Sequence, residues 1–227
     1  VEYSGTGSIL KLIEDRKKEL SLLGLFDDDK KKKLPKYPKS IGVLTSSSGS
    51  VIHDIIHRIS ERFPVVRIKV FPISVQGKNS HIEIIDFLDL IENHDSKDFF
   101  KPDLIIFARG GGSLEELMPF NEPDLIKRVF KLKIPNISAI GHDTDYTLLD
   151  YVSDLRAPTP TAAAEIAVPD KNYLLNQIQD LQVKLNQSIE QKYLSIEQLL
   201  LRFKNSVNYF SNFIKDVENK LSKINSE

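Results

Sequence analysis

Short apolar runs alternate with segments of helical periodicity along residues 40–168. The apolar runs cover residues 41–46, 65–75, 103–110 and 135–142. The segments that place apolar side chains at helical spacing are 50–63, 80–93 and 122–132. This alternation predicts an α/β fold, in which helices flank a parallel sheet with Rossmann-like or flavodoxin-like layering.

The chain on the N-terminal side of this region reads as a connection. Residues 8–23 have the apolar spacing of an amphipathic helix, and Gly24 is suited to end it. The next stretch, 26–39, is a block of aspartates and lysines followed by two prolines, which is typical of an exposed connector. Because the sequence opens abruptly at "VEYSGTG", we expect a fragment in which residues 1–40 join a preceding domain to an α/β domain at 41–168.

The C-terminal part, from Asn172 onward, predicts one long helix. Its apolar residues recur in steps of three and four: Leu174, Ile178, Leu181, Leu185, Ile189, Tyr193, Ile196, Leu200, Phe203, Val207, Phe210, Ile214, Val217, Leu221 and Ile224. That spacing is typical of a coiled-coil seam. A single helix cannot bury such a stripe, so residues 169–227 should form an extended coiled-coil helix that binds a partner or a second copy.

Composition narrows the range of functions. The net charge of −1 provides no general attraction to nucleic acid, so any such site must be a local basic patch. The absence of cysteine excludes a disulfide framework and a cysteine-based zinc site, and it fits a reducing cytosol. No apolar run approaches the ~20 residues of a membrane span. These features predict a soluble, cytoplasmic protein.

Polar and glycine-rich segments follow three of the predicted strands. In a parallel sheet the ligand crevice lies beyond the carboxyl ends of the strands, so these segments are the candidates for function. They are "TSSSGS" (45–50), "ARGGGS" (108–113) and "GHDTD" (141–145). A fourth polar segment, "DLRAPTPTAAAE" (154–165), leads into an alanine-rich helix start.

The first two segments are suited to phosphate. In "ARGGGS", backbone N–H groups at Gly110, Gly111, Gly112 and Ser113 can approach a phosphate, and Arg109 can bind two of its oxygens. Glycines also serve tight strand–helix turns, and the segment is not a GxGxxG dinucleotide motif. "TSSSGS" similarly fits an anion-binding helix start, with Ser46 and Ser48 as ligands, or an ordinary helix cap.

Histidines occur in two informative places. In "GHDTD", His142 is suited to acid–base chemistry, with Asp145 or Asp143 orienting its ring, although a hydrogen-bonded turn would also explain the segment. "HDIIH" (53–57) has two histidines on one helix face, but it has Asp54 where a metalloprotease has glutamate, and no third ligand is evident. We therefore predict no metal site.

Taken together, these segments indicate a particular protein family far more specifically than any one of them does alone. "IGVLTSSSGSVIHDIIHRISERFP", "RGGGSLEEL", "FNEP", "GHDTD" and "LRAPTPTAAAE", in this order, resemble the large subunit of exodeoxyribonuclease VII. The resemblance covers essentially the whole chain. It implies an OB-fold domain on the N-terminal side of residue 1. The sequence departs from the family pattern at Ser47, His53 and Asp143, where the family commonly has proline, arginine and glutamate.

The resemblance also implies roles for individual residues. The family's proposed catalytic positions correspond to Asp54, Arg109, His142 and Asp145. With Arg156 as a second phosphate clamp, these would hydrolyse single-stranded DNA from both ends without an obligatory cofactor, although Asp54 and Asp145 could hold Mg²⁺. Short small subunits would dock on the coiled-coil helix, for which the expected contact residues are Phe203, Phe210, Phe213 and Ile214.

One alternative belongs to another functional class. A non-catalytic phosphate- or nucleotide-binding α/β module with a coiled-coil arm would also need the "RGGGS" segment and basic residues. Such a module has no chemical need for His142 beside Asp145, however. The two hypotheses therefore differ in whether the acid–base groups face the same crevice as the glycine loop.

Overall fold

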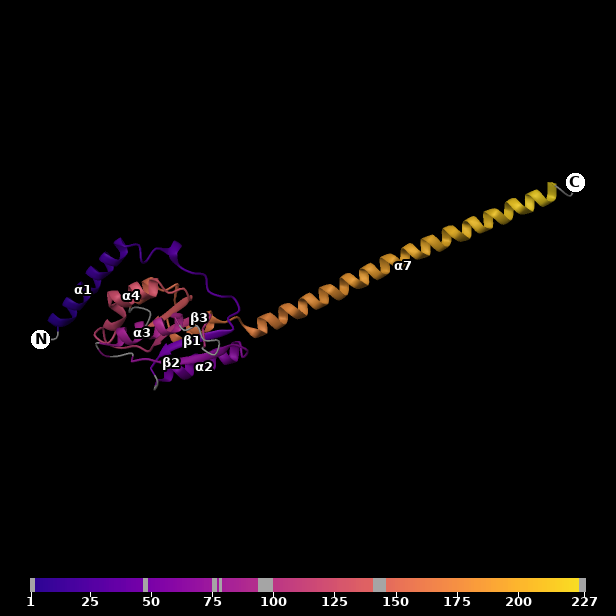
Figure 1. Ribbon diagram of the computed structural model, residues 1–227. Helices are drawn as coiled ribbons and strands as arrows, with labels where there is room; N and C mark the ends of the chain where they lie inside the picture. The colour runs from indigo at the N-terminus through magenta and orange to yellow at the C-terminus, as the bar shows by residue number, and fades with distance from the viewer. Residues whose placement is uncertain are drawn as a thin grey trace. The chain divides into compact units, whose positions relative to one another are not determined.

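The computed structural model describes residues 3–46, 49–74, 77, 79–93, 100–140 and 146–224 (Figure 1). Within these residues, five parallel strands form one sheet in the order β2-β1-β3-β4-β5. The strands are β1 (Ser40–Thr45), β2 (Arg67–Pro72), β3 (Leu104–Arg109), β4 (Asn136–Ile140) and β5 (Leu155–Arg156). This is the flavodoxin-like strand order, so the predicted fold class is confirmed.

Helices cover both faces of this sheet. The α-helices are α1 (Tyr3–Leu22), α2 (Ser50–Arg62), α3 (Ser80–Asn93), α4 (Pro123–Phe130), α5 (Leu148–Val152), α6 (Pro160–Ala167) and α7 (Lys171–Ile224). Two short 3₁₀ turns, η1 (Asp28–Lys30) and η2 (Met118–Asn121), lie in the connections. The helices predicted at 50–63, 80–93 and 122–132 lie close to their observed bounds, whereas the helix predicted at 8–23 begins five residues earlier, at Tyr3.

The sheet has an apolar core on each face because successive side chains of a strand point to opposite sides. On one face, Leu44 and Phe107 pack in a cluster that includes residues of α1, α3, α4 and α5. On the other face, Val43 and Ile106 pack with α2 and α6. The central strands β1, β3 and β4 are buried on both faces, which is why they read as continuous apolar runs in the sequence.

The segment before β1 packs on the α/β region. Leu20 of α1 is fully buried in the first cluster, and Leu25 lies in the same cluster. The lysine-rich connector also contacts this region. Asp154 accepts a hydrogen bond from the backbone N–H of Lys32 at 2.7 Å and another from the Asn136 side chain of β4 at 2.9 Å. Residues 1–172 accordingly form one compact unit, and residues 173–227 form a second.

The second unit is helical. Helix α7 comprises 54 residues and begins at Lys171, one residue from the predicted start. Every described side chain from residue 175 to residue 222 is exposed, including the whole predicted seam in that range. Among the described helices, none combines the length and apolar character needed to cross a bilayer.

Candidate active site

The strand order places a topological switch point between β1 and β3, where chain connections leave toward opposite faces of the sheet. Helix α2, which follows β1, packs on one face, and α4, which follows β3, packs on the other. In parallel sheets the ligand crevice forms at this point, outside the carboxyl ends of the strands. The loops after Thr45 and after Arg109 therefore flank the expected crevice.

One glycine contact shows that these loops are neighbours. A Cβ atom added to Gly110 would lie 3.5 Å from Cγ2 of Val51, in the first turn of α2. A Cβ atom added to Gly49 would lie 3.1 Å from Oγ of Ser46. The first contact brings the loop after β3 to the start of α2, and the second is a close contact within the loop after β1. Ser46 and Gly110, predicted separately as phosphate ligands, thus lie on neighbouring loops.

Asp54 lies three residues after Val51 on α2 and is exposed. Residues three apart on a helix are neighbours on its surface, so Asp54 lies one turn from the Gly110 contact. Because it is exposed, the Asp54 carboxylate is accessible to solvent and ligands. His53 and His57 are also exposed on α2.

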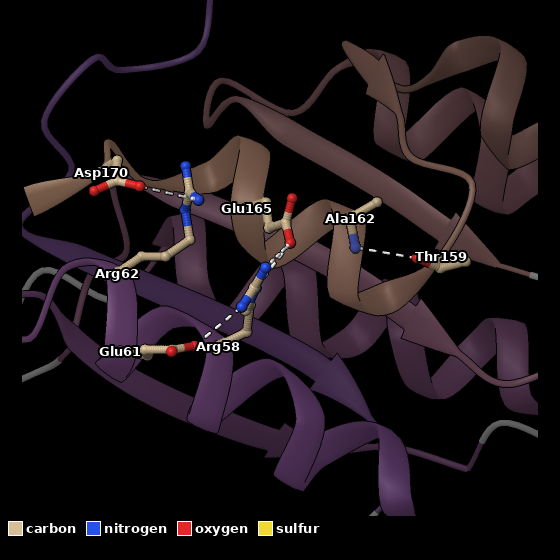
Figure 2. Close-up of polar contacts among 7 residues, drawn as sticks. All are labelled: Arg58, Glu61, Arg62, Thr159, Ala162, Glu165 and Asp170. Atoms are coloured by element: carbon tan, nitrogen blue, oxygen red, sulfur yellow. Dashed lines mark hydrogen bonds and ion pairs between the residues drawn. The ribbon is translucent and has the colours of Figure 1, made fainter. Parts of the chain in front are cut away.

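The position of α2 is fixed from the other end by α6 (Figure 2). Nε of Arg58 donates to Oε1 of Glu165 at 2.8 Å, and Nη1 of the same arginine donates to Glu61 at 3.0 Å. Arg62 pairs with Asp170 at 3.4 Å. The alanine-rich start of α6 allows this close packing, because Ala163 and Ala164 are fully buried there. The segment "PTPTAAAE" therefore holds the helix that carries Asp54.

Arg109 is the last residue of β3 and is almost fully buried, with 4% of its surface exposed. Its guanidinium does not point freely into solvent. Nη1 donates to the backbone carbonyl of Glu116 at 2.7 Å, and Nη2 donates to Oε2 of the same residue at 2.8 Å. The arginine thus binds Glu116 at two points, its backbone carbonyl and its carboxylate, and the same two donors can bind two oxygens of a phosphate.

The glycine loop folds tightly over this ion pair. A Cβ atom on Gly112 would collide with Nη2 of Arg109 and with Oε2 of Glu116, so no side chain fits at this position. Ser113 closes the loop, since its backbone N–H donates to Oε2 of Glu116 at 3.2 Å and its hydroxyl accepts from the Glu116 N–H at 3.4 Å. Gly111 and Ser113 are exposed. Arg109 and the loop together bind the Glu116 carboxylate.

Arg156, the predicted second clamp, lies at the end of β5. Its guanidinium carbon lies 3.8 Å from the centroid of the Tyr146 ring. Tyr146 is half-exposed, so an aromatic ring lies at this edge of the sheet. A cavity of about 170 Å³ borders Tyr146 and Gly112, which places both near one opening.

A buried carboxylate, Asp150, organises the same edge. It accepts hydrogen bonds from Oγ of Ser138 at 2.6 Å, from the Thr147 backbone N–H at 2.7 Å and from the Thr147 hydroxyl at 2.8 Å. Burial raises the pKa of the Asp150 carboxyl, while these hydrogen bonds and the nearby charge of Arg156 oppose the rise. These contacts tie the start of α5 to strand β4, directly after residues 141–145.

Asn121 provides a second anchor for the start of α5. Its side-chain oxygen accepts from the Leu148 backbone N–H at 2.8 Å, and its backbone carbonyl accepts from Nη1 of Arg16 at 2.9 Å. Arg16 also pairs with Glu122 at 3.0 Å. Helix α1, the loop after β3 and the start of α5 are therefore connected by polar contacts.

Three predicted site residues, Ser48, His142 and Asp145, lie outside the described residues, as does Asp143. Among the residues that are described, no group of three or more histidine or carboxylate side chains is arranged to hold a metal ion. The described part of the site contains Arg109, the glycine loop, the start of α2 with Asp54, and Arg156 beside Tyr146.

Sequence reasoning missed several residues of this region, among them Glu116 and Asp150. Glu116 escapes it because six residues outside any helix or strand separate it from Arg109, so no periodicity relates the two. Asp150 carried a usable signal, since Thr147 and Asp150 have the spacing of a capping box at a helix start.

Comparison with known proteins identifies close relatives. Residues 25–227 match the family described as "Exonuclease VII, large subunit". The exodeoxyribonuclease 7 large subunit of Bartonella quintana is 49% identical over 206 residues, which is 89% of this chain and 42% of that protein. The protein of the same name from Rhizobium etli strain CFN 42 is 45% identical over 210 residues, or 89% of this chain and 39% of its own length.

A third relative, from Zymomonas mobilis and of the same name, is 45% identical over 190 residues, or 83% of this chain and 35% of that protein. This chain thus spans about two fifths of the length of such relatives. These similarities do not favour the alternative of a non-catalytic binding module.

Proposed function

The chain belongs to the exonuclease VII large-subunit family, and we propose that it is the catalytic part of a bacterial exonuclease. Its substrate would be single-stranded DNA, which the enzyme hydrolyses from both ends to short oligonucleotides. In this proposal residues 41–168 carry out the chemistry in the cytoplasm, and residues 169–227 bind small subunits. The observation that supports it most directly is the match over residues 25–227, which includes every candidate catalytic position.

Hydrolysis of a phosphodiester requires three things. A nucleophile must be activated, the charge on the phosphoryl oxygens must be neutralised, and the leaving oxygen must be protonated. We assign the second task to Arg109 and the glycine-loop N–H groups, with Arg156 as an additional clamp. The supporting observation is that Arg109 and Ser113 N–H already converge on one carboxylate oxygen.

We assign proton transfer to His142, which would act as general base toward water or as the nucleophile itself. Asp145 would orient the imidazole and stabilise its charged form, in the manner of the third member of a triad. Asp54 would be the second acid–base group or would position Arg109. No step requires a divalent metal, and Mg²⁺ held by carboxylates would remain an addition to this set.

Nuclease activity itself is the direct test of this function. The chain would be assembled with small subunits and incubated with labelled single-stranded or duplex DNA. We expect short acid-soluble products from the single strand, and the same products from a label at either end. A preparation that binds oligonucleotide without releasing products would instead indicate the binding module.

The docking of small subunits is the second part of the proposal. Phe203, Phe210, Phe213 and Ile214 are 69%, 66%, 58% and 54% exposed on α7, a larger apolar surface than a lone soluble helix normally presents. With about 1.5 Å per residue, the 54 residues of α7 span about 80 Å, long enough for several short helices.

Replacing both Phe210 and Ile214 by aspartate should abolish small-subunit binding, because two charges would then lie in an apolar seam. Co-purification measures the loss, and circular dichroism checks that the α/β unit stays folded. A matched control replaces Asn205 and Asn212, polar residues of the same helix, by aspartate. If the Phe210 and Ile214 variant still formed the complex, α7 would not be the docking helix.

Residues 1–227 alone should bind single-stranded DNA weakly and in a salt-sensitive manner. Strong binding of single strands requires a basic groove and aromatic rings on which the bases stack. The Tyr146 ring already contacts Arg156, so this face of the ring is not free to stack on a base. We propose that an OB-fold domain outside these residues supplies most of the affinity. Fluorescence anisotropy with oligothymidylate measures the affinity of residues 1–227. Nanomolar binding at physiological salt would contradict this prediction.

A further inference from the structure

The phosphate-binding edge of Arg109 is occupied by an anion from the same chain. Glu116 accepts from both terminal nitrogens of the guanidinium, through its carbonyl at 2.7 Å and through Oε2 at 2.8 Å. The Arg109 side chain is only 5% exposed, so an incoming phosphate cannot reach it in this arrangement. If Arg109 holds the substrate phosphate, Glu116 must first give way.

We propose that Glu116 is a carboxylate latch, which occupies Arg109 in the free protein and is displaced by a phosphate of the DNA strand. This inference rests on the proposed function, because it takes Arg109 as a ligand of the substrate. It assigns Glu116 a role in setting the affinity of that site.

The donors around the carboxylate already form a site for an oxygen anion. Oε2 of Glu116 accepts from Nη2 of Arg109 at 2.8 Å and from the Ser113 N–H at 3.2 Å. A phosphoryl oxygen in its place would receive the same two hydrogen bonds. Gly112 packs directly against the pair, since a Cβ atom there would collide with Nη2 of Arg109 and Oε2 of Glu116, so the loop backbone lies next to the bound oxygen.

The latch can open without large cost to the fold. The Glu116 side chain is 43% exposed and lies in an irregular stretch, so it can rotate into solvent without breaking a helix or strand. Arg109, in contrast, is fixed at the end of β3 and buried, and a buried guanidinium is stable only with a counter-charge. Exchange of carboxylate for phosphate keeps that charge paired in both states.

The neighbouring Glu115 provides a matched control. It is exposed, and it forms no ion pair with any other residue that the structure describes. Replacing either glutamate by glutamine removes one negative charge from the same loop. Any general electrostatic effect on DNA binding is therefore common to both variants, and the difference between them measures the release of Arg109.

Binding of a fluorescent oligothymidylate to the chain assembled with small subunits tests the latch, with His142→Ala as background to prevent digestion. Glu116→Gln should bind about tenfold more tightly than Glu115→Gln, which is the scale of one charged hydrogen bond. Glu116→Asp, which keeps the charge but shortens the arm, should also bind more tightly than the parent. The Glu116→Asp variant replaces Glu116→Gln in this test if the glutamine variant folds poorly.

Combination with Arg109→Ala separates the possible failures. In that background the gain from Glu116→Gln should vanish. If Arg109→Ala weakens binding but neither Glu116 variant strengthens it, the latch is wrong while the phosphate role of Arg109 stands. If Arg109→Ala leaves the affinity unchanged, Arg109 does not hold phosphate, and both the latch and this part of the proposed function fail.

Discussion

Replacing His142 by alanine should slow the hydrolysis of single-stranded DNA at least ~100-fold, the scale of general acid–base catalysis. The reason is that no other proposed group at the site has an ordinary pKa near neutrality, so proton transfer would lose its carrier. DNA binding should barely change, because the phosphate is assigned to Arg109 and the glycine loop. Single-turnover rates with the small subunits present measure the first effect, and anisotropy measures the second.

His57→Ala is the control for this experiment. His57 is exposed on α2 and has no role in the proposed mechanism, so its removal should leave the rate within about twofold, as is usual for surface substitutions. Equal rates for the two alanine variants would show that His142 is a structural residue of the "GHDTD" segment.

Substituting lysine for Arg109 should have the second large effect, a loss of about 100-fold in kcat/KM, comparable to the removal of one transition-state hydrogen-bond donor. Lysine keeps the charge but cannot bind two oxygens at once with the planar fork of arginine. It also cannot reproduce the two bonds that Arg109 makes with Glu116. Initial rates over a range of DNA concentrations measure the loss.

Arg128→Lys is the matched control, because Arg128 is also an ion-paired arginine with little exposure. It binds Asp89 at 2.6 Å and Glu92 at 3.0 Å, between α4 and α3. Its replacement should lower the melting temperature slightly while kcat/KM stays near that of the parent. If Arg109→Lys changed only the melting temperature in the same way, Arg109 would be a structural residue.

The sequence predicted the sheet well wherever strands are buried on both faces. The run around Ile106 and the run around Ile137 are apolar because helices cover both sides of them, and each run ends within two residues of the observed strand. Strand β5 was not predicted, because Leu155 and Arg156 are too few for any periodicity. A tertiary contact defines it, since the Ala157 N–H donates to the Ser138 carbonyl at 2.8 Å.

The candidate site was predictable to the extent that it follows strand ends. Arg109 and the glycines were found because an apolar run stops there. The state of Arg109 was not predictable, since its ion pair with Glu116 depends on how an irregular loop folds back on itself. The ion pair between Arg58 and Glu165 was missed for a similar reason, because its two members are 107 positions apart in the sequence.

The central claim is that His142, together with Arg109 and the carboxylates, performs hydrolysis without an obligatory divalent metal. The most direct measurement is the release of acid-soluble products from end-labelled single-stranded DNA in excess EDTA. Parent and His142→Ala chains would be compared, each assembled with small subunits. We predict that the parent remains active in EDTA and that His142→Ala loses at least ~100-fold. The mechanism would be contradicted if the parent were inactive in EDTA, or if the His142→Ala chain kept near-normal turnover in EDTA.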